Sequence, residues 1–166
     1  MQQVRPVHRA PAGSAPEEVA TPMTIDDILA QVAEERAWLD RTVRIDWPAE
    51  RWLAVLGDRV GGVCQAVMRG GHDGDLQAAL VDVAAACGAW MQALLPYEPP
   101  GELTALIAGC ARSSASFQRL EHLILALASV AEVAHLAEHG PQSLAERLGR
   151  LGGVAVAWAA SIGREA

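Results

Sequence analysis

The sequence contains no lysine and no asparagine, and it has only one Tyr and one Phe among 166 residues. All 13 basic residues are therefore Arg, which we interpret as the codon bias of a GC-rich genome. The net charge of −7 argues against broad nucleic-acid binding, which requires a basic surface. The chain lacks both an apolar run of roughly 18 residues, as a membrane span requires, and an apolar signal-peptide core. We therefore expect a cytoplasmic protein that binds neither nucleic acid nor a membrane.

Cysteine is also scarce, and the three residues Cys64, Cys87 and Cys110 are widely spaced within apolar helical patterns. No CxxC pair or zinc-ligand spacing is present, so we predict buried reduced thiols, with a reactive thiol as the alternative. The sequence also has no Ser-His-Asp ordering, no phosphate-loop glycine motif and no dinucleotide-binding fingerprint. The sequence therefore gives no indication of a serine hydrolase, a phosphate-loop nucleotide hydrolase or a dinucleotide-binding enzyme.

The residues that dominate the sequence are Ala, Leu and Val, and 51% of the chain is apolar. Because Ala and Leu are strong helix formers, this composition favours closely packed helices over sheets. We predict an all-α bundle of about six helices. Residues 1–23 carry four Pro and no periodicity, which predicts a disordered tail. A first helical unit should cover residues 24–96, and a second unit, 97–166, should pack with it as one domain.

Local signals place the ends of the expected helices. Thr24 and Asp27 predict a capping box, and the helix that follows should run to about Val43. Pro48 is expected in the first turn of the second helix, Asp75 as the N-cap of the third, and Ser143 as a cap of the last. The remaining helices should cover about 102–112 and 117–139. An apolar stripe at helical spacing marks the first helix: Ile25, Ile28, Leu29, Val32, Ala33, Arg36 and Leu39.

Two features concern packing between helices. Gly61 and Gly62 fall in mid-helix, where each destabilises by roughly 1 kcal/mol relative to Ala, so we expect a neighbouring helix to approach closely there. The second half of the chain also resembles the first. Matching residues are 70 positions apart before the loop that joins the second and third helices of each half, and 68 positions apart after it. We therefore predict an internal repeat, in which each unit covers the apolar face of the other. The five Trp residues are expected to pack in the core or between units, with nucleobase stacking as the alternative: Trp38, Trp47, Trp52, Trp90 and Trp158.

The segments 52–68 and 76–95, joined by Gly-Gly-His-Asp-Gly-Asp, resemble the helix pair of the MazG-like nucleotide pyrophosphohydrolases, an all-α family. In that family the second helix carries Glu-x-x-Glu and the third carries Glu-x-x-Asp. Residues three apart share a helix face, so the four carboxylates meet and hold magnesium. A metal-bound water then attacks the phosphate chain. The resemblance covers residues 38–95 and extends more weakly into the second half.

This chain departs from the family pattern at the acidic positions. The Glu-x-x-Glu positions are Arg59 and Gly62, and the third-helix positions are Ala79 and Asp82. Only Asp82 keeps its carboxylate, with Asp58 next to the first position. In the second half the corresponding residues are Ser129, Glu132, Arg147 and Arg150.

The resemblance therefore implies two sets of candidate residues. Magnesium would be held by Asp58, Asp82 and Glu132, and phosphates would be contacted by Arg59, Arg147 and Arg150. The simpler alternative for these Arg residues is pairing with Asp58, Asp82 or Glu146. Glu132-x-x-His135, followed by His139, is half of a di-metal motif, but no second copy is present and we expect a solvated helix end. The same solvated role is expected for His72 and its acidic neighbours.

Three functional classes follow from these residues. In the preferred one, the chain is a degenerate MazG-like protein without hydrolase activity that acts as a nucleotide-binding, regulatory or assembly component. It would act with a nucleotide, a protein partner or a second copy of itself. The alternative is an active, magnesium-dependent nucleoside triphosphate pyrophosphohydrolase that completes its site from both halves or by dimerising. The third class is a purely structural helical protein.

Overall fold

The computed structural model describes residues 23–42, 46–70, 73–114, 119–135 and 140–162 of the chain. Within these ranges the secondary structure is entirely helical, which confirms the predicted all-α bundle. The helices are α1 (Ile25–Thr42), α2 (Ala49–Met68), α3 (Asp73–Leu94), α4 (Pro100–Ser113), α5 (Leu120–His135) and α6 (Pro141–Ser161). The predicted tail, except Met23, lies outside the described residues, as do His72 and His139. None of the described helices is long and apolar enough to cross a membrane.

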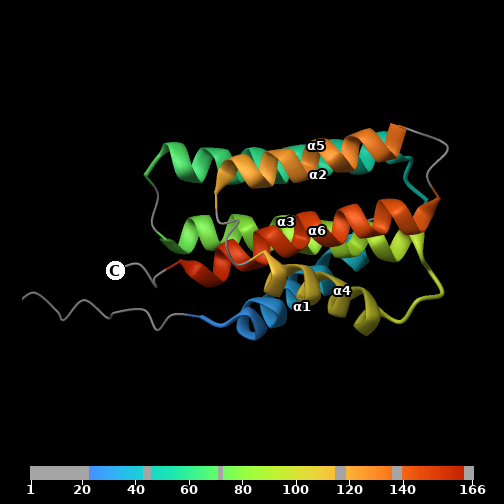
Figure 1. The fold of residues 1–166 in the computed structure, drawn as a ribbon, viewed down its shortest axis with the longest axis horizontal. Coiled ribbons are helices and arrows are strands. Elements are labelled where there is room, and N and C mark those ends of the chain that lie inside the picture. The colour runs from blue at the N-terminus through green and yellow to red at the C-terminus, as the bar shows by residue number, and fades with distance from the viewer. Residues whose placement is uncertain (1–22, 43–45, 71–72, 115–118, 136–139, 163–166) are drawn as a thin grey trace, which may run out of the picture.

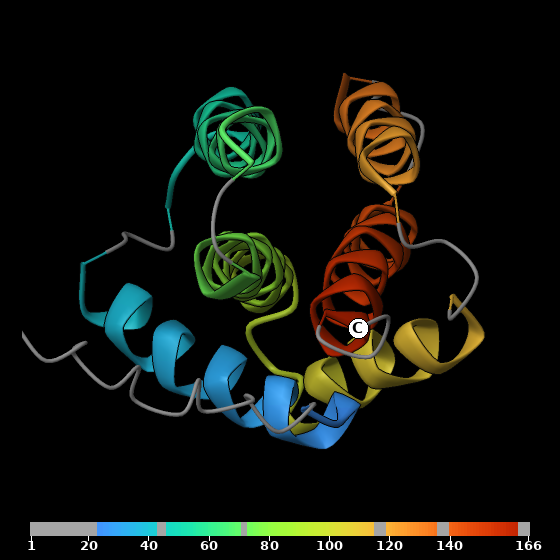
Figure 2. The same cartoon turned by 90° about the vertical axis from the view of Figure 1, so that its left-hand side faces the viewer.

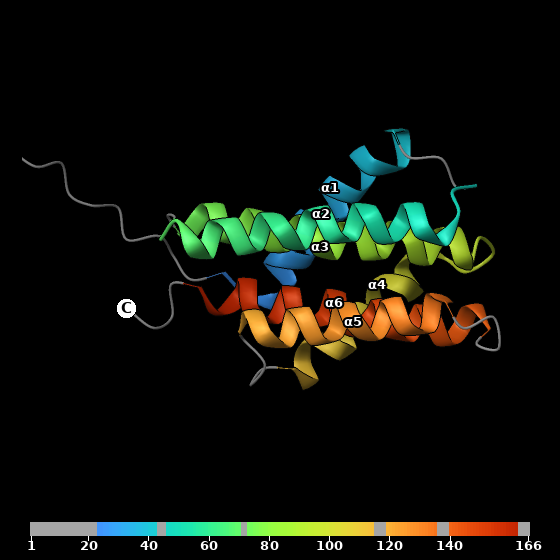
Figure 3. The same cartoon turned by 90° about the horizontal axis from the view of Figure 1, so that it is seen from above.

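The helices form layers around a central pair (Figure 1). The end-on view shows α3 and α6 next to each other, with α2 above α3, α5 above α6, and α1 and α4 crossing below (Figure 2). Seen from above, the α2–α3 pair and the α5–α6 pair run along the same direction (Figure 3). Each three-helix segment thus places its third helix at the centre, its second above and its first below. The internal repeat itself stays a prediction.

The central position of α3 and α6 explains their composition. Nearly every residue of α3 from Leu80 to Met91 is buried, although the spacing of its large apolar residues predicts a single buried stripe. The reason is that α3 contacts α1 on one side, α2 on another and α6 on a third. A helix that is apolar on all sides is expected in such a core. Ala and Gly make up more than half of the buried residues of α3 and α6 taken together.

The predicted capping box at the start of α1 is confirmed. The Thr24 backbone N–H donates to Asp27 Oδ2 at 2.8 Å, and the Asp27 N–H donates to Thr24 Oγ1 at 3.2 Å. The hydroxyl of Thr24 also donates to Asp27, and these bonds hold the pKa of the Asp27 carboxyl below its usual value.

The three other predicted helix caps differ from the structure by one to three residues. Pro48 is the N-cap of α2 rather than a first-turn residue. Helix α3 begins at Asp73, so Asp75 lies inside its first turn. A carboxylate there is stabilised by the positive end of the helix dipole. Helix α6 begins at Pro141 after the N-cap Gly140, and Ser143 is therefore already helical. A Pro in the first turn has no N–H to leave unsatisfied, which explains the earlier start of α6.

The predicted close approach at Gly61 and Gly62 is wrong. A Cβ atom built at either position would meet no atom of another helix within 4 Å. Close approach occurs instead at Gly153 of α6, where a Cβ would lie 2.5 Å from the Cβ of Cys110 and 2.8 Å from the backbone N of Ala111. Helices α4 and α6 therefore pack almost backbone to backbone.

Aromatic packing joins α2 to α3. The rings of Trp52 and Trp90 stack with their centroids 5.9 Å apart at 5° between planes, and both residues are only 2% exposed. Trp47 extends this group, with its ring 5.3 Å from Trp52 and the guanidinium of Arg51 above it at 4.1 Å. These contacts confirm the packing role predicted for Trp52 and Trp90. Trp38, in contrast, is 48% exposed.

Candidate functional site

Helices α2 and α3 bring two of the predicted site residues together. Arg59 Nη1 lies 3.3 Å from Asp82 Oδ2, in an ion pair whose side chains are 31% and 36% exposed. The two residues come from the helix faces that the MazG-like resemblance assigns to magnesium ligands. The alternative prediction of an ion pair for Arg59 is therefore confirmed.

Partial burial controls the electrostatics of this pair. Removal of water raises the pKa of the Asp82 carboxyl above its ordinary value of 3.8, and the positive charge of Arg59 opposes that rise without cancelling it. A guanidinium thus already provides the charge that this carboxylate needs. A divalent cation at the same place would have to displace Arg59 or tolerate its repulsion.

A cavity of about 400 Å³ opens between α2 and the first turns of α3. It is lined by Gly62, Gln65, Ala66, Arg69, Asp75 and Ala79. Two of these residues, Gly62 and Ala79, occupy positions where the resemblance places glutamates. The space is open partly because these positions carry no side chain or a single methyl group. We call this cavity, together with the adjoining Arg59–Asp82 pair, the α2–α3 groove.

The α2–α3 groove has a polar wall that sequence reasoning missed. Arg69 lines it, and Arg69 Nη2 donates to Gln65 Oε1 at 3.4 Å. A sequence signal for this residue exists, because Arg59, Gly62 and Arg69 follow one another at spacings of three and seven, which keeps them on one helix face. Arg69 lies beyond the Glu-x-x-Glu positions through which α2 resembles the family, so the resemblance does not single it out.

The other predicted site residues do not line this cavity. Asp58 and Glu132 are exposed, on α2 and α5 respectively. Arg147 and Arg150 belong to α6, a helix that makes no contact with α2 in the described part of the chain. Burial raises the pKa of the Cys110 thiol on α4, and Arg150 is near enough to oppose that shift.

No metal centre can be assembled from these carboxylates as they stand. Across the ranges that the structure describes, no three side chains among His, Cys, Asp and Glu form a group that could hold a metal ion. Asp58, Asp82 and Glu132 therefore do not converge. Glu132 and His135, the half-motif of a di-metal site, are both exposed on α5.

The predicted cysteine environments are confirmed in part. Cys87 is fully buried, and burial raises the pKa of its thiol far above the ordinary value. Cys64 and Cys110 are only partly buried. All three are free thiols.

Comparisons of the chain with models of protein families, with curated proteins and with solved structures gave no match.

Proposed function

We propose that the protein is a degenerate MazG-like protein that has lost metal-dependent hydrolysis and binds a nucleotide in the α2–α3 groove, as a regulatory or assembly component. The observation that carries the proposal is the ion pair between Arg59 and Asp82 at 3.3 Å. It puts a guanidinium on the one carboxylate that remains from the family's four acidic positions.

Loss of hydrolysis follows from the ligand chemistry of magnesium. The ion prefers hard oxygen ligands and gives up its water reluctantly, so it needs several carboxylates or substrate oxygens at once. Here Gly62 and Ala79 provide no ligand, and Arg59 adds a positive charge beside Asp82. Of the two carboxylates at the groove, Asp82 is already paired with Arg59, and Asp75 alone would leave most of the hydration shell of the ion in place.

Nucleotide binding is supported by the size of the groove and by its Arg residues. A volume of about 400 Å³ falls within the range of small-molecule sites, about 300–1,000 Å³. Arg69 lines the cavity, and a guanidinium can bind phosphate oxygens through two parallel hydrogen bonds. Because the guanidinium groups take the place of the metal, the triphosphate should bind without magnesium.

Thermal unfolding in the presence of NTPs and dNTPs, with a chelator in place of magnesium, tests this proposal. A nucleotide at ten times its Kd should stabilise the fold by about 1.4 kcal/mol, which raises Tm by about 3–6 °C for a chain of this size. Arg69→Ala should remove most of the shift. Arg119→Ala is the matched control, because Arg119 is exposed and does not line the groove. No shift at millimolar nucleotide would favour the purely structural role.

A second experiment tests the relationship to the family separately. The combined substitutions Arg59→Glu, Gly62→Glu and Ala79→Glu would restore four carboxylates together with Asp82. If α2 and α3 face each other as the resemblance implies, magnesium should raise the Tm of this variant and leave the wild type unchanged. The same three positions changed to Gln provide a control of similar size without the charges. Equal responses of the Glu and Gln variants to magnesium would refute the assignment of these positions.

A further inference from the structure

A buried Arg lies on α1, on the opposite side of α3 from α2. Arg36 is only 8% exposed, although it is charged, and it occupies the apolar stripe of its helix. Its Nη2 donates to Gln92 Oε1 of α3 at 2.8 Å. The side chain passes over Gly88, where a Cβ would lie 3.4 Å from Arg36 Cδ. The Arg36 side chain thus packs directly against Gly88, in the space between α1, α3 and α4.

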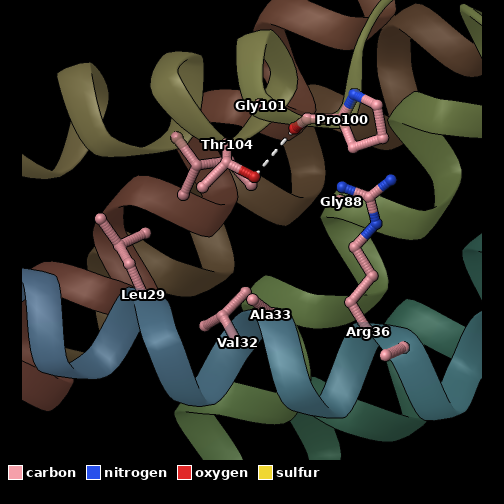
Figure 4. A pocket seen from close by; sticks show the side chains of 10 residues that line it. Leu29, Val32, Ala33, Arg36, Gly88, Pro100, Gly101 and Thr104 are labelled. Atoms are coloured by element: carbon pink, nitrogen blue, oxygen red, sulfur yellow. Dashed lines mark hydrogen bonds between the residues drawn. The ribbon is translucent and has the colours of Figure 1, made fainter.

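A cavity of about 230 Å³ lies in that space, and among the residues that the structure describes Arg36 is the only charged one that lines it. Figure 4 shows Leu29, Val32 and Arg36 on α1 facing Thr104 and Pro100 of α4. The remaining walls are mostly aliphatic or are made by glycine. They are formed by Ala33, Ala37, Gly88, Gly101 and Ile107.

The cavity is accessible from the surface on the α1 side. Ala33 and Ala37 both line it and are both exposed, so solvent reaches its edge between them. The deeper wall is formed by Val32 and Ile107, which are 4% and 2% exposed. An entering molecule would therefore meet polar surroundings near Arg36 and apolar surroundings along α1 and α4.

We propose that this cavity, here called the Arg36 cavity, binds a small aliphatic carboxylate, with the carboxylate on the Arg36 guanidinium and the hydrocarbon chain against the walls from α1 and α4. A guanidinium has five N–H donors in a planar fork that matches carboxylate geometry, and it can hold an internal partner and a ligand together. An ion pair in a partly dehydrated cavity is stronger than the same pair at the surface.

The size and polarity of the walls select the ligand class. The volume lies below the roughly 300–1,000 Å³ of sites for drug-sized ligands, so only a compact molecule fits. A bare inorganic anion would leave the aliphatic walls in contact with water, whereas a short hydrocarbon chain covers them. A cation would be repelled by Arg36.

Titration calorimetry with straight-chain carboxylates, from acetate to octanoate, tests this proposal. Each added methylene should tighten binding by about fourfold until the cavity is full, because burial of one such group has that effect on an equilibrium constant. The amides of the same chain lengths should bind at least about tenfold more weakly, since they lack the charge that Arg36 recognises. Inorganic phosphate is the third probe and should not bind.

Two substitutions in α1 distinguish binding in the Arg36 cavity from nonspecific binding elsewhere on the protein. Ala33→Leu fills the mouth of the Arg36 cavity and should abolish binding, whereas Ala30→Leu makes the same change at an exposed position that does not line the cavity. Both positions are exposed, so neither substitution disturbs the core. Arg36→Met should weaken binding by about tenfold or more.

The result expected is carboxylate binding that strengthens with chain length, is lost in Ala33→Leu and is kept in Ala30→Leu. Equal binding of amides and carboxylates would overturn the role of Arg36. Carboxylate binding that survives Ala33→Leu would overturn the location. Binding of phosphate alone, or of none of the probes at millimolar concentration, would overturn the ligand class.

Discussion

Substitutions of glycine by alanine should have opposite effects on α2 and on α6. At Gly62 a Cβ meets no atom of another helix within 4 Å, so the substitution should add helix propensity and lose no packing. The expected gain is about 0.5–1 kcal/mol, since glycine in mid-helix destabilises by that amount relative to alanine. Gly61 is in the same situation and should respond in the same way.

At Gly153 the packing term exceeds the propensity term. The new Cβ would lie 2.5 Å from Cys110 Cβ and 2.8 Å from the backbone N of Ala111. Backbone atoms cannot rotate away as a flexible side-chain end can, so α4 and α6 would have to separate. Overpacking of this kind destabilises by about 1–3 kcal/mol, which outweighs a propensity gain of about 1 kcal/mol or less.

Thermal and urea unfolding of Gly62→Ala, Gly61→Ala and Gly153→Ala measures this difference. A change of 1 kcal/mol corresponds to about 2–4 °C in Tm for a chain of this size, which is well within detection. Destabilisation by Gly62→Ala would show that the glycine on α2 is needed for a contact absent from this structure. A neutral or stabilising Gly153→Ala would refute the close packing of α4 on α6.

Three further predictions concern the core and the ion pair. Trp52→Ala should destabilise the fold by about 3–5 kcal/mol, measured by urea unfolding, because the ring is 2% exposed and stacks on Trp90; a loss below 1 kcal/mol would contradict the stacking. The raised pKa of Asp82 means that the folded state keeps a proton that the unfolded state releases just above pH 3.8, so stability should fall as pH rises through that window. Asp82→Asn should remove this part of the pH dependence, and an unchanged pH profile of the unfolding free energy would contradict it. Cys87 should resist iodoacetamide in the folded protein and react in denaturant, as read by mass spectrometry, because its thiol is fully buried with a raised pKa; labelling under native conditions would contradict its burial.

Local sequence signals predicted the helices and one contact between them. The capping box at Thr24 involves only two residues, three positions apart, so the local sequence is enough to predict it. The structure confirms it. The pairing of Arg59 with Asp82 is one of the alternatives that the sequence predicts, and opposite charges on facing helices attract. These features require no knowledge of how distant segments pack.

The features that were missed depend on tertiary packing. A glycine in mid-helix has the same local cost whether a neighbouring helix touches it or not, so sequence alone could not distinguish Gly62 from Gly153. The burial of Arg36 depends on packing against Gly88, more than fifty residues away, and on the position of α4. The all-round burial of α3 likewise depends on neighbouring helices, α1, α2, α4 and α6, whose positions its own periodicity does not reveal.

The most direct test of the proposed function is pyrophosphate release by the wild-type protein, incubated with a panel of NTPs and dNTPs and magnesium. Arg59 pairs with Asp82, the one carboxylate that remains of the family's four acidic positions, and Gly62 and Ala79 provide no ligand. We therefore expect pyrophosphate release no faster than in buffer alone. Magnesium-dependent turnover that is abolished by Asp82→Asn would contradict the account and establish an active pyrophosphohydrolase.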